Sequence, residues 1–93
     1  MIRANPPAFS PGTILATPNA MEQLPSHEQQ RALARHVAGD WGDCCPEDAE
    51  ANDAALKNRD RLLSVYHTAD QIKFWIITEA DRSTTTILLP EDY

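Results

Sequence analysis

Glycine is scarce in this sequence, which has only Gly12, Gly39 and Gly42. Neither GxGxxG nor GxxxxGK[ST] is present. Both patterns need closely spaced glycines, because the backbone amides must approach phosphate groups without side chains in the way. We therefore expect no nucleotide-binding loop and no nucleotide cofactor.

Long hydrophobic runs are also missing. The longest strongly apolar run is Phe74–Ile77, whereas a membrane-spanning helix needs about 20 apolar residues. Residues 1–7 contain one arginine and two prolines but no apolar stretch, so no secretory signal peptide is visible. These features predict a cytoplasmic protein that does not bind membranes.

Cysteine is limited to the adjacent pair Cys44 and Cys45. Neighbouring cysteines rarely form a disulfide, because the ring they would close is strained. A structural zinc site needs cysteines separated by about two to four residues, so the pair with His36, Asp40 and Asp43 nearby does not fit one. We expect reduced thiols, no metal and no cofactor, with one cysteine packed inward and the other at a helix N-terminus.

Basic residues are few: eight Lys and Arg stand against fourteen Asp and Glu, for a net charge of −6. Arg31 and Arg35 share a predicted helix face, and Lys57, Arg59 and Arg61 lie close in sequence. Neither group extends into a stripe, and binding to nucleic acid depends on clustered cations. Direct nucleic-acid binding is therefore not expected.

The patterns that are present predict an α+β fold. Three local patterns are typical of helix starts: Thr17 with Pro18, Ser26 with Gln29 as a capping box, and Cys45 with Pro46. Period-two alternation with β-branched and aromatic residues is typical of strands. Strands are predicted at 13–16, 61–67, 72–79 and 84–89, and helices at 18–24, 26–38 and 46–58.

These elements predict an antiparallel sheet of three to four strands with two or three helices packed on one face. Residues 13–93 are expected to form this single domain, and the proline-rich residues 1–12 an extended N-terminal arm. The third helix should turn Ala51, Ala55 and Leu56 inward. The predicted core, with Trp41 sealing one end, consists of Leu33, Val37, Leu56, Leu63, Val65, Phe74 and Ile76.

One arrangement for catalysis is conceivable. A small enzyme or toxin could use His36, Cys45 and Asp81, since nucleophilic catalysis needs a nucleophile, a base and an orienting acid. The alternative is that each residue has an ordinary structural role. His36 would then pack at its helix end, and Asp81, Arg82 and Ser83 would form a hairpin turn with a local ion pair.

Carboxylates are concentrated in one segment without a basic residue. This acidic ridge consists of Asp40, Asp43, Glu47, Asp48, Glu50 and Asp53. Some of them complement the positive end of the third helix. The others could steer a partner with a basic surface, including a protein surface that normally holds nucleic acid. The alternative is a solvated face that only aids solubility.

Four segments resemble one family: ARHVAGDWGD at 34–43, NDAAL at 52–56, WIITEADRS at 75–83 and TTILLPEDY at 85–93. The family comprises small uncharacterised proteins carried on bacterial plasmids, integrative elements and prophages. The resemblance covers about residues 13–93 and implies a bacterial mobile-element origin. It implies no activity, ligand or catalytic residue.

Together these features favour a non-enzymatic accessory protein of a mobile element that binds a host protein. The sharpest form of this hypothesis is an inhibitor of bacterial defence, of the anti-CRISPR or anti-restriction kind. The small enzyme or toxin is one alternative. Another is a structural or regulatory homodimer that pairs through an apolar second face of the sheet, with Tyr66, Trp75 or Ile77 exposed.

Overall fold

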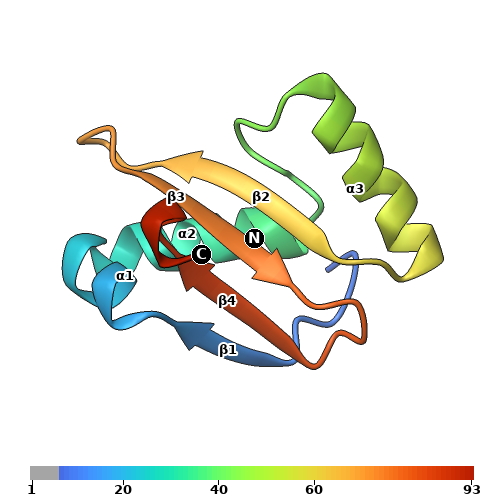
Figure 1. The fold of residues 1–93 in the computed structure, drawn as a ribbon, viewed down its shortest axis with the longest axis horizontal. Coiled ribbons are helices and arrows are strands. Elements are labelled where there is room, and N and C mark those ends of the chain that lie inside the picture. Colours follow the sequence, from blue (N-terminus) through green and yellow to red (C-terminus); the bar gives the residue numbers. More distant parts are fainter. Residues whose placement is uncertain (1–6) are drawn as a thin grey trace, which may run out of the picture.

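A computed structural model of the protein describes residues 7–93. Every predicted helix and strand lies within one residue of its predicted bounds, and the 3-10 helix at Pro90–Asp92 was not predicted. Residues 1–6 of the predicted arm lie outside the described residues. In chain order (Figure 1), the elements are β1 (Thr13–Ala16), α1 (Pro18–Gln23), α2 (Ser26–Val37), α3 (Pro46–Asn58), β2 (Leu62–His67), β3 (Lys73–Thr78), β4 (Thr84–Leu88) and the short 3-10 helix η1 (Pro90–Asp92).

The four strands form one sheet in the order β1-β4-β3-β2. The last three strands pair antiparallel as predicted, but β1 runs parallel to β4, with Thr13 opposite Thr84. The α+β class is confirmed, and the purely antiparallel sheet is wrong. A short turn reveals strand direction in a sequence, whereas β1 and β4 are separated by all three helices and the β2–β3 hairpin.

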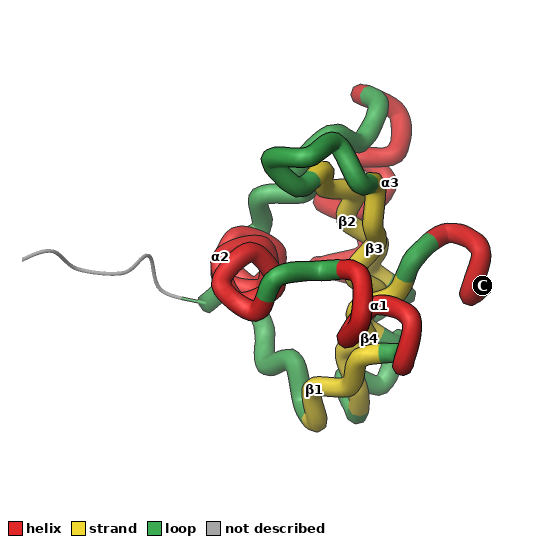
Figure 2. The backbone as a smooth tube through the Cα atoms, turned by 90° about the vertical axis from the view of Figure 1, so that its left-hand side faces the viewer, coloured by secondary structure: helices red, strands yellow, loops and turns green. Residues whose placement is uncertain are grey.

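The sheet has different covers on its two faces. In Figure 2, α2 lies on one side of the sheet and the C-terminal segment with η1 on the other. The main core lies on the α2 side, where Tyr66, Phe74, Ile76 and Ile87 pack against Ala32. On the opposite side the ring of Trp75 lies 5.7 Å from the ring of Tyr93.

The predicted inward face of β2 is wrong. Leu62, Ser64 and Tyr66 are buried, while Leu63 and Val65 are only half-buried on the other face. Both alternating sets contain two large apolar side chains, so hydrophobicity does not decide between them. What the alternation does not reveal is the partner of Ser64, whose hydroxyl bonds to the buried His36 from this inward face.

The other predicted core residues have mixed outcomes. Phe74, Ile76 and Trp41 are buried, as expected. Three other predicted core residues, all on helices, are only half-buried: Leu33, Val37 and Leu56. On α3, Ala55 is buried but Ala51 is exposed, and Asn52 takes the inward position instead.

The predictions for the helix starts also have mixed outcomes. Thr17 Oγ1 accepts a hydrogen bond from the Ala20 amide at 3.1 Å, so the predicted cap of α1 is confirmed. The capping box predicted for α2 is wrong: Pro25 is the N-cap, and the Gln29 side chain donates through Nε2 to the Leu24 carbonyl at 2.9 Å. The Leu24 carbonyl, in the turn before α2, thus binds the glutamine side chain that the predicted capping box would have used.

Residues 7–12 contain no helix or strand but contact the domain. The Ala8 amide donates to the Val37 carbonyl at 2.7 Å, and Phe9 packs against the cluster around Trp41. The Thr85 hydroxyl donates to the Pro11 carbonyl at 2.8 Å. Within residues 7–93, no helix is both long and apolar enough to cross a membrane.

Candidate functional site

The acidic ridge begins in a loop that is fixed against β2. Arg35 donates to both carboxylate oxygens of Asp40, at 2.8 and 3.2 Å. The Gly42 amide donates to the same carboxylate, and the Tyr66 hydroxyl donates to the Asp40 carbonyl. The Val65 amide donates to the Trp41 carbonyl at 3.1 Å. The loop therefore continues the hydrogen bonding of the sheet beyond β2.

Helix α3, which carries the rest of the ridge, is attached to the same sheet edge. The Asn52 amide group donates to the Leu63 carbonyl at 2.7 Å, and its carbonyl accepts from the Leu63 amide at 3.1 Å. One side chain thus replaces a neighbouring strand for that residue. Trp41 Nε1 donates to the Asp53 carboxylate at 2.9 Å, which ties the loop to the helix.

The structure divides the ridge into two groups. Asp40, Asp43 and Asp53 have partners within the protein: Arg35, His67 at 2.7 Å and Trp41. The hydrogen bonds from Arg35 hold the pKa of Asp40 below its usual value. The remaining three are exposed and have no ion pair with any described residue; these outer carboxylates are Glu47, Asp48 and Glu50.

Asn52 was missed by the sequence patterns, and it yields a stability prediction. Asn52→Ala should lower the free energy of unfolding by about 2 kcal/mol, since the Leu63 amide and carbonyl lose partners in a partly buried place. Chemical denaturation measures the loss, and amide exchange at Leu63 should quicken. Asn58→Ala, at the exposed end of the same helix, is the control and should change stability by no more than about 0.5 kcal/mol. Equal losses in the two variants would contradict the role of Asn52.

His36 lies in a buried polar chain. Thr85 uses its single hydroxyl proton on the Pro11 carbonyl, so it accepts from Thr78 at 2.7 Å. Thr78 in turn accepts from His36 Nε2–H at 2.8 Å, and His36 Nδ1 accepts from the Ser64 hydroxyl. Both ring nitrogens of His36 therefore have hydrogen-bond partners, in the arrangement that a neutral ring protonated on Nε2 would make.

Burial lowers the pKa of His36 to about 4, and the positive charge of Arg82 adds to this effect. In residues 7–93, every buried side-chain nitrogen and oxygen has a hydrogen-bond partner. The chain of hydroxyls thus satisfies a histidine that no solvent reaches, and it leaves neither ring nitrogen available to act as a base.

Cys45 and Asp81 lie elsewhere. Cys45 is the exposed N-cap of α3; its pKa is raised because the nearby carboxylates of Asp48 and Glu47 outweigh the effect of the Asp48 amide, which lowers it. Asp81 accepts from the Ser83 amide and hydroxyl at 2.9 and 2.6 Å, which closes the β3–β4 turn. Neither residue is among the hydrogen-bond partners of His36.

Individual hydrogen bonds test the predictions for the turn at 81–83 and for the two cysteines. The predicted turn at 81–83 is confirmed, but its predicted ion pair is wrong, because Arg82 donates to the carbonyls of Asp60 and Ala55. Cys44 is half-buried and its thiol donates to the Leu63 carbonyl at 3.4 Å, so the predicted division of the two cysteines is confirmed. Among residues 7–93, no three His, Cys, Asp or Glu side chains are grouped to hold a metal ion.

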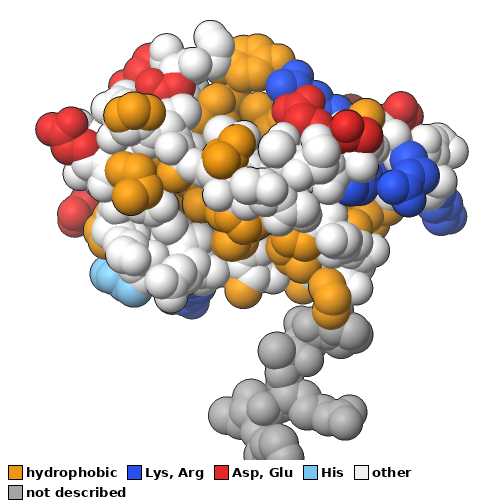
Figure 3. All heavy atoms as spheres, turned by 90° about the horizontal axis from the view of Figure 1, so that it is seen from below, with side chains coloured by type: hydrophobic (Ala, Val, Ile, Leu, Met, Phe, Trp, Pro, Cys, Tyr) orange, Lys and Arg blue, Asp and Glu red, His pale blue; other side chains and the backbone are white. Residues whose placement is uncertain are grey.

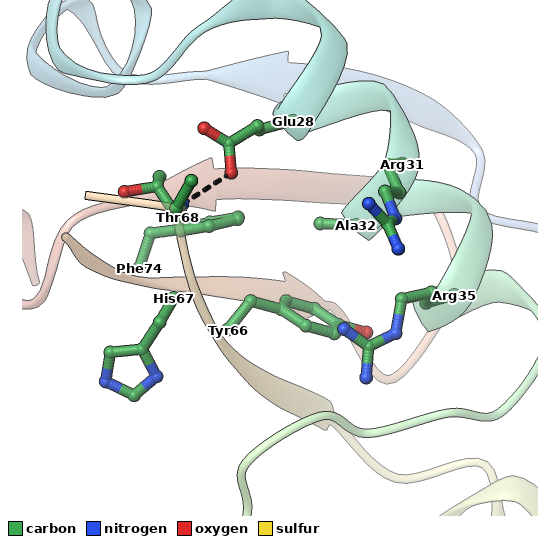
Figure 4. A pocket seen from close by; sticks show the side chains of 9 residues that line it. Glu28, Arg31, Ala32, Arg35, Tyr66, His67, Thr68 and Phe74 are labelled. Carbon is green, nitrogen blue, oxygen red and sulfur yellow. Dashed lines mark hydrogen bonds between the residues drawn. The ribbon is translucent and has the colours of Figure 1, made fainter. Parts of the chain in front are cut away.

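A pocket of about 270 Å³ opens between α2 and the end of β2. In Figure 4, Arg31 and Arg35 extend from α2 on one side, His67 lies on the other, and the Tyr66 ring lies between them. Two of the lining groups have ion pairs: Arg35 pairs with Asp40 and His67 with Asp43. Glu28 and Arg31 have none among the described residues, and the Glu28 carboxylate accepts from the Ala69 amide. These two groups have opposite formal charges, so the lining does not favour a ligand of one sign.

No family model matches this chain, and no similar protein was found among curated proteins or solved structures. Function therefore has to be inferred from the contacts, burial and charges of the chain itself.

Proposed function

We propose that this chain is a small non-enzymatic accessory protein of a bacterial mobile genetic element, acting in the host cytoplasm by binding a host protein with a basic surface. The observation that carries the proposal is the group of outer carboxylates, Glu47, Asp48 and Glu50, which are exposed and unpaired among the described residues. Three acidic groups on one helix, none of them in an ion pair among the described residues, form a negative surface that attracts a positive one.

The support beneath these carboxylates favours binding. Helix α3 lies beside β2 at one edge of the molecule (Figure 1), and Asn52 and Trp41 hold it there. A surface that is already ordered loses little conformational entropy when a partner binds. A shallow depression of about 380 Å³ next to Glu50, lined also by Ala54 and Lys57, offers room for a partner side chain.

The resemblance to mobile-element proteins suggests the class of partner. Plasmids and prophages face host defence nucleases, and surfaces that hold nucleic acid are rich in Lys and Arg. An acidic protein that occupies such a surface would block it without catalysis. We therefore propose an inhibitor of the anti-CRISPR or anti-restriction kind as the specific form of this function.

The two alternatives have less support in the geometry. An enzyme built on His36, Cys45 and Asp81 would need these side chains to converge, and His36 is instead fully buried among hydroxyl groups. A homodimer through the second sheet face would need an open apolar patch there. Ile77 is 2% exposed, Tyr66 points into the main core, and Trp75 packs on Tyr93.

The test uses a double variant of the outer carboxylates. Glu47→Gln/Glu50→Gln should keep the fold, with a loss of stability of no more than about 1 kcal/mol from the helix dipole. In a bacterial host with an active CRISPR or restriction system, expression of the natural chain should raise the plating efficiency of a targeted phage. The double variant should lose most of this protection.

The control removes the same charge elsewhere. Glu22→Gln/Glu91→Gln neutralises two exposed glutamates, on α1 and η1, and should protect the phage like the natural chain. With the partner isolated, the α3 variant should associate several-fold more slowly at roughly 0.05 M salt, and the rates should converge at roughly 0.5 M. Equal association rates of both double variants at low salt would show that the outer carboxylates only solubilise the protein.

A further inference from the structure

The two edges of the sheet differ in what covers them. The β2 edge is covered by the Trp41–Asp43 loop and by Asn52. At the other edge, no described element lies beyond β1 (Figure 1). The amides of Thr13 and Thr17 donate inward to the Ser83 and Ile87 carbonyls, at 2.9 and 3.0 Å. By the alternation of a strand, the backbone groups of Ile14 and Ala16 point outward.

The side chains of β1 are apolar on both faces. Ile14 lies beside Thr85 on the α2 side, and Leu15 lies beside Thr86 on the opposite side. Ile14 is 41% exposed and Leu15 is 47% exposed, although both belong to the sheet. An additional strand would cover both of them at once.

Charge is absent from this edge. Residues 4–21 contain no Asp, Glu, Lys or Arg, although a quarter of the chain is charged. Figure 3 views the molecule from the β1 side: hydrophobic side chains are spread over the middle of this surface, and charged side chains lie toward its margins. Edge strands usually carry a charge, a proline or a bulge that prevents pairing, and Thr13–Ala16 has neither a charge nor a proline.

We propose that this edge pairs with the β1 strand of a second copy, antiparallel across a two-fold axis, to form one continuous sheet. Ile14 would then lie opposite Ala16 of the second copy and exchange backbone hydrogen bonds with it. The two Leu15 side chains would meet at the axis. This inference is independent of the proposed function.

Charge is the reason for choosing a second copy as the occupant. Two chains with a net charge of −6 repel each other, so they approach most easily through a surface without charges. A partner of opposite charge would gain nothing from this edge. Because the strand is only four residues long, the interface belongs to the small, transient class, and we expect a dissociation constant of about 10 µM or weaker.

Sedimentation equilibrium tests the proposal on the purified chain. Between roughly 5 µM and 1 mM protein, the apparent mass should rise from 10.4 kDa toward twice that value. Higher salt should favour the dimer, because it screens the repulsion between two acidic copies. This salt response is opposite to the one expected for binding through α3.

Two variants test the edge itself. Leu15→Lys places a charge at the axis, and Ile14→Pro removes an outward amide without removing a bond to β4. Both should remain monomeric over the full range. Ala51→Lys, which adds the same charge on exposed α3, should dimerise like the natural chain. Near-ultraviolet circular dichroism confirms that each variant is folded.

Two results would overturn the proposal. One is a natural chain that stays monomeric at about 1 mM protein and high salt. The other is a dimer that persists in folded Leu15→Lys and Ile14→Pro. The first result would mean that β1 pairs with a strand of a different protein or stays exposed to solvent. The second would mean that the dimer forms through another surface.

Discussion

His36→Ala is expected to reduce the free energy of unfolding by about 3 kcal/mol or more. The ring is completely buried and bonds to both Ser64 and Thr78. Its removal leaves a cavity and leaves the buried Ser64 hydroxyl without its acceptor, while Thr78 keeps its bond to Thr85. An unsatisfied buried group costs about 1–3 kcal/mol, and the cavity adds to this cost. For a domain of this size such a loss is a large share of the total stability.

Chemical denaturation at pH 7 measures this loss, with His67→Ala as the control. His67 is exposed and pairs only with Asp43 at the surface, so its removal should cost less than about 1 kcal/mol. If the two histidine variants were equally stable, the buried hydroxyl chain would contribute nothing to the fold.

The same residue makes stability depend on pH. The pKa of His36 is about 4 in the folded protein, against 6.5 for an ordinary histidine. The folded state therefore binds a proton less readily than the unfolded state. Its stability is fully present above pH 6.5 and falls as the pH drops toward 4, by about 3 kcal/mol in total. His36→Ala should lose this contribution, whereas His67→Ala should retain it.

Gly42→Ala is expected to reduce the free energy of unfolding by more than about 3 kcal/mol. Gly42 has φ of +72°, where an L side chain is strained. A Cβ there would lie 2.0 Å from the Val65 carbonyl oxygen and 2.7 Å from the Tyr66 ring. The loop would have to leave the β2 edge. The bond from the Val65 amide to the Trp41 carbonyl and the bond from the Asp43 amide to the Val65 carbonyl would then be lost.

Gly39→Ala is the matched control. Gly39 also has a positive φ, of +86°, but an added Cβ would meet only the Ala8 Cβ at 3.9 Å. Its cost should be the left-handed backbone strain alone, about 1–2 kcal/mol. Thermal unfolding distinguishes the two variants. If Gly42→Ala melted at the same temperature as Gly39→Ala, the close packing of the loop on β2 would be refuted.

Local signals account for what was predictable in the fold. Thr17 with Pro18 and Cys45 with Pro46 mark the starts of α1 and α3. Their physical basis lies within a few residues: capping of free amides, the fixed φ of proline and the alternation of strand side chains. The division of Cys44 and Cys45 into an inward and a surface position followed from the same local pattern.

The candidate site was only partly predictable. The acidic ridge is visible as composition, but its division is not. Asp40 pairs with Arg35, and Asp53 accepts a hydrogen bond from Trp41. These partners depend on how the loop and α3 pack together. Asn52 gave no signal, since one asparagine on a helix is ordinary in a sequence, and its role exists only because the backbone of Leu63 lies beside it.

By itself, the sequence determined the helices and strands, the α+β class and the acidic character of the surface around α3, because these depend on short-range preferences and composition. Only the tertiary structure decided three other features. It set the parallel direction of β1, the inward face of β2 and the open β1 edge. Each of these depends on contacts between segments far apart in the chain, such as Ser64 with His36, and no local pattern records which distant partner a residue will meet.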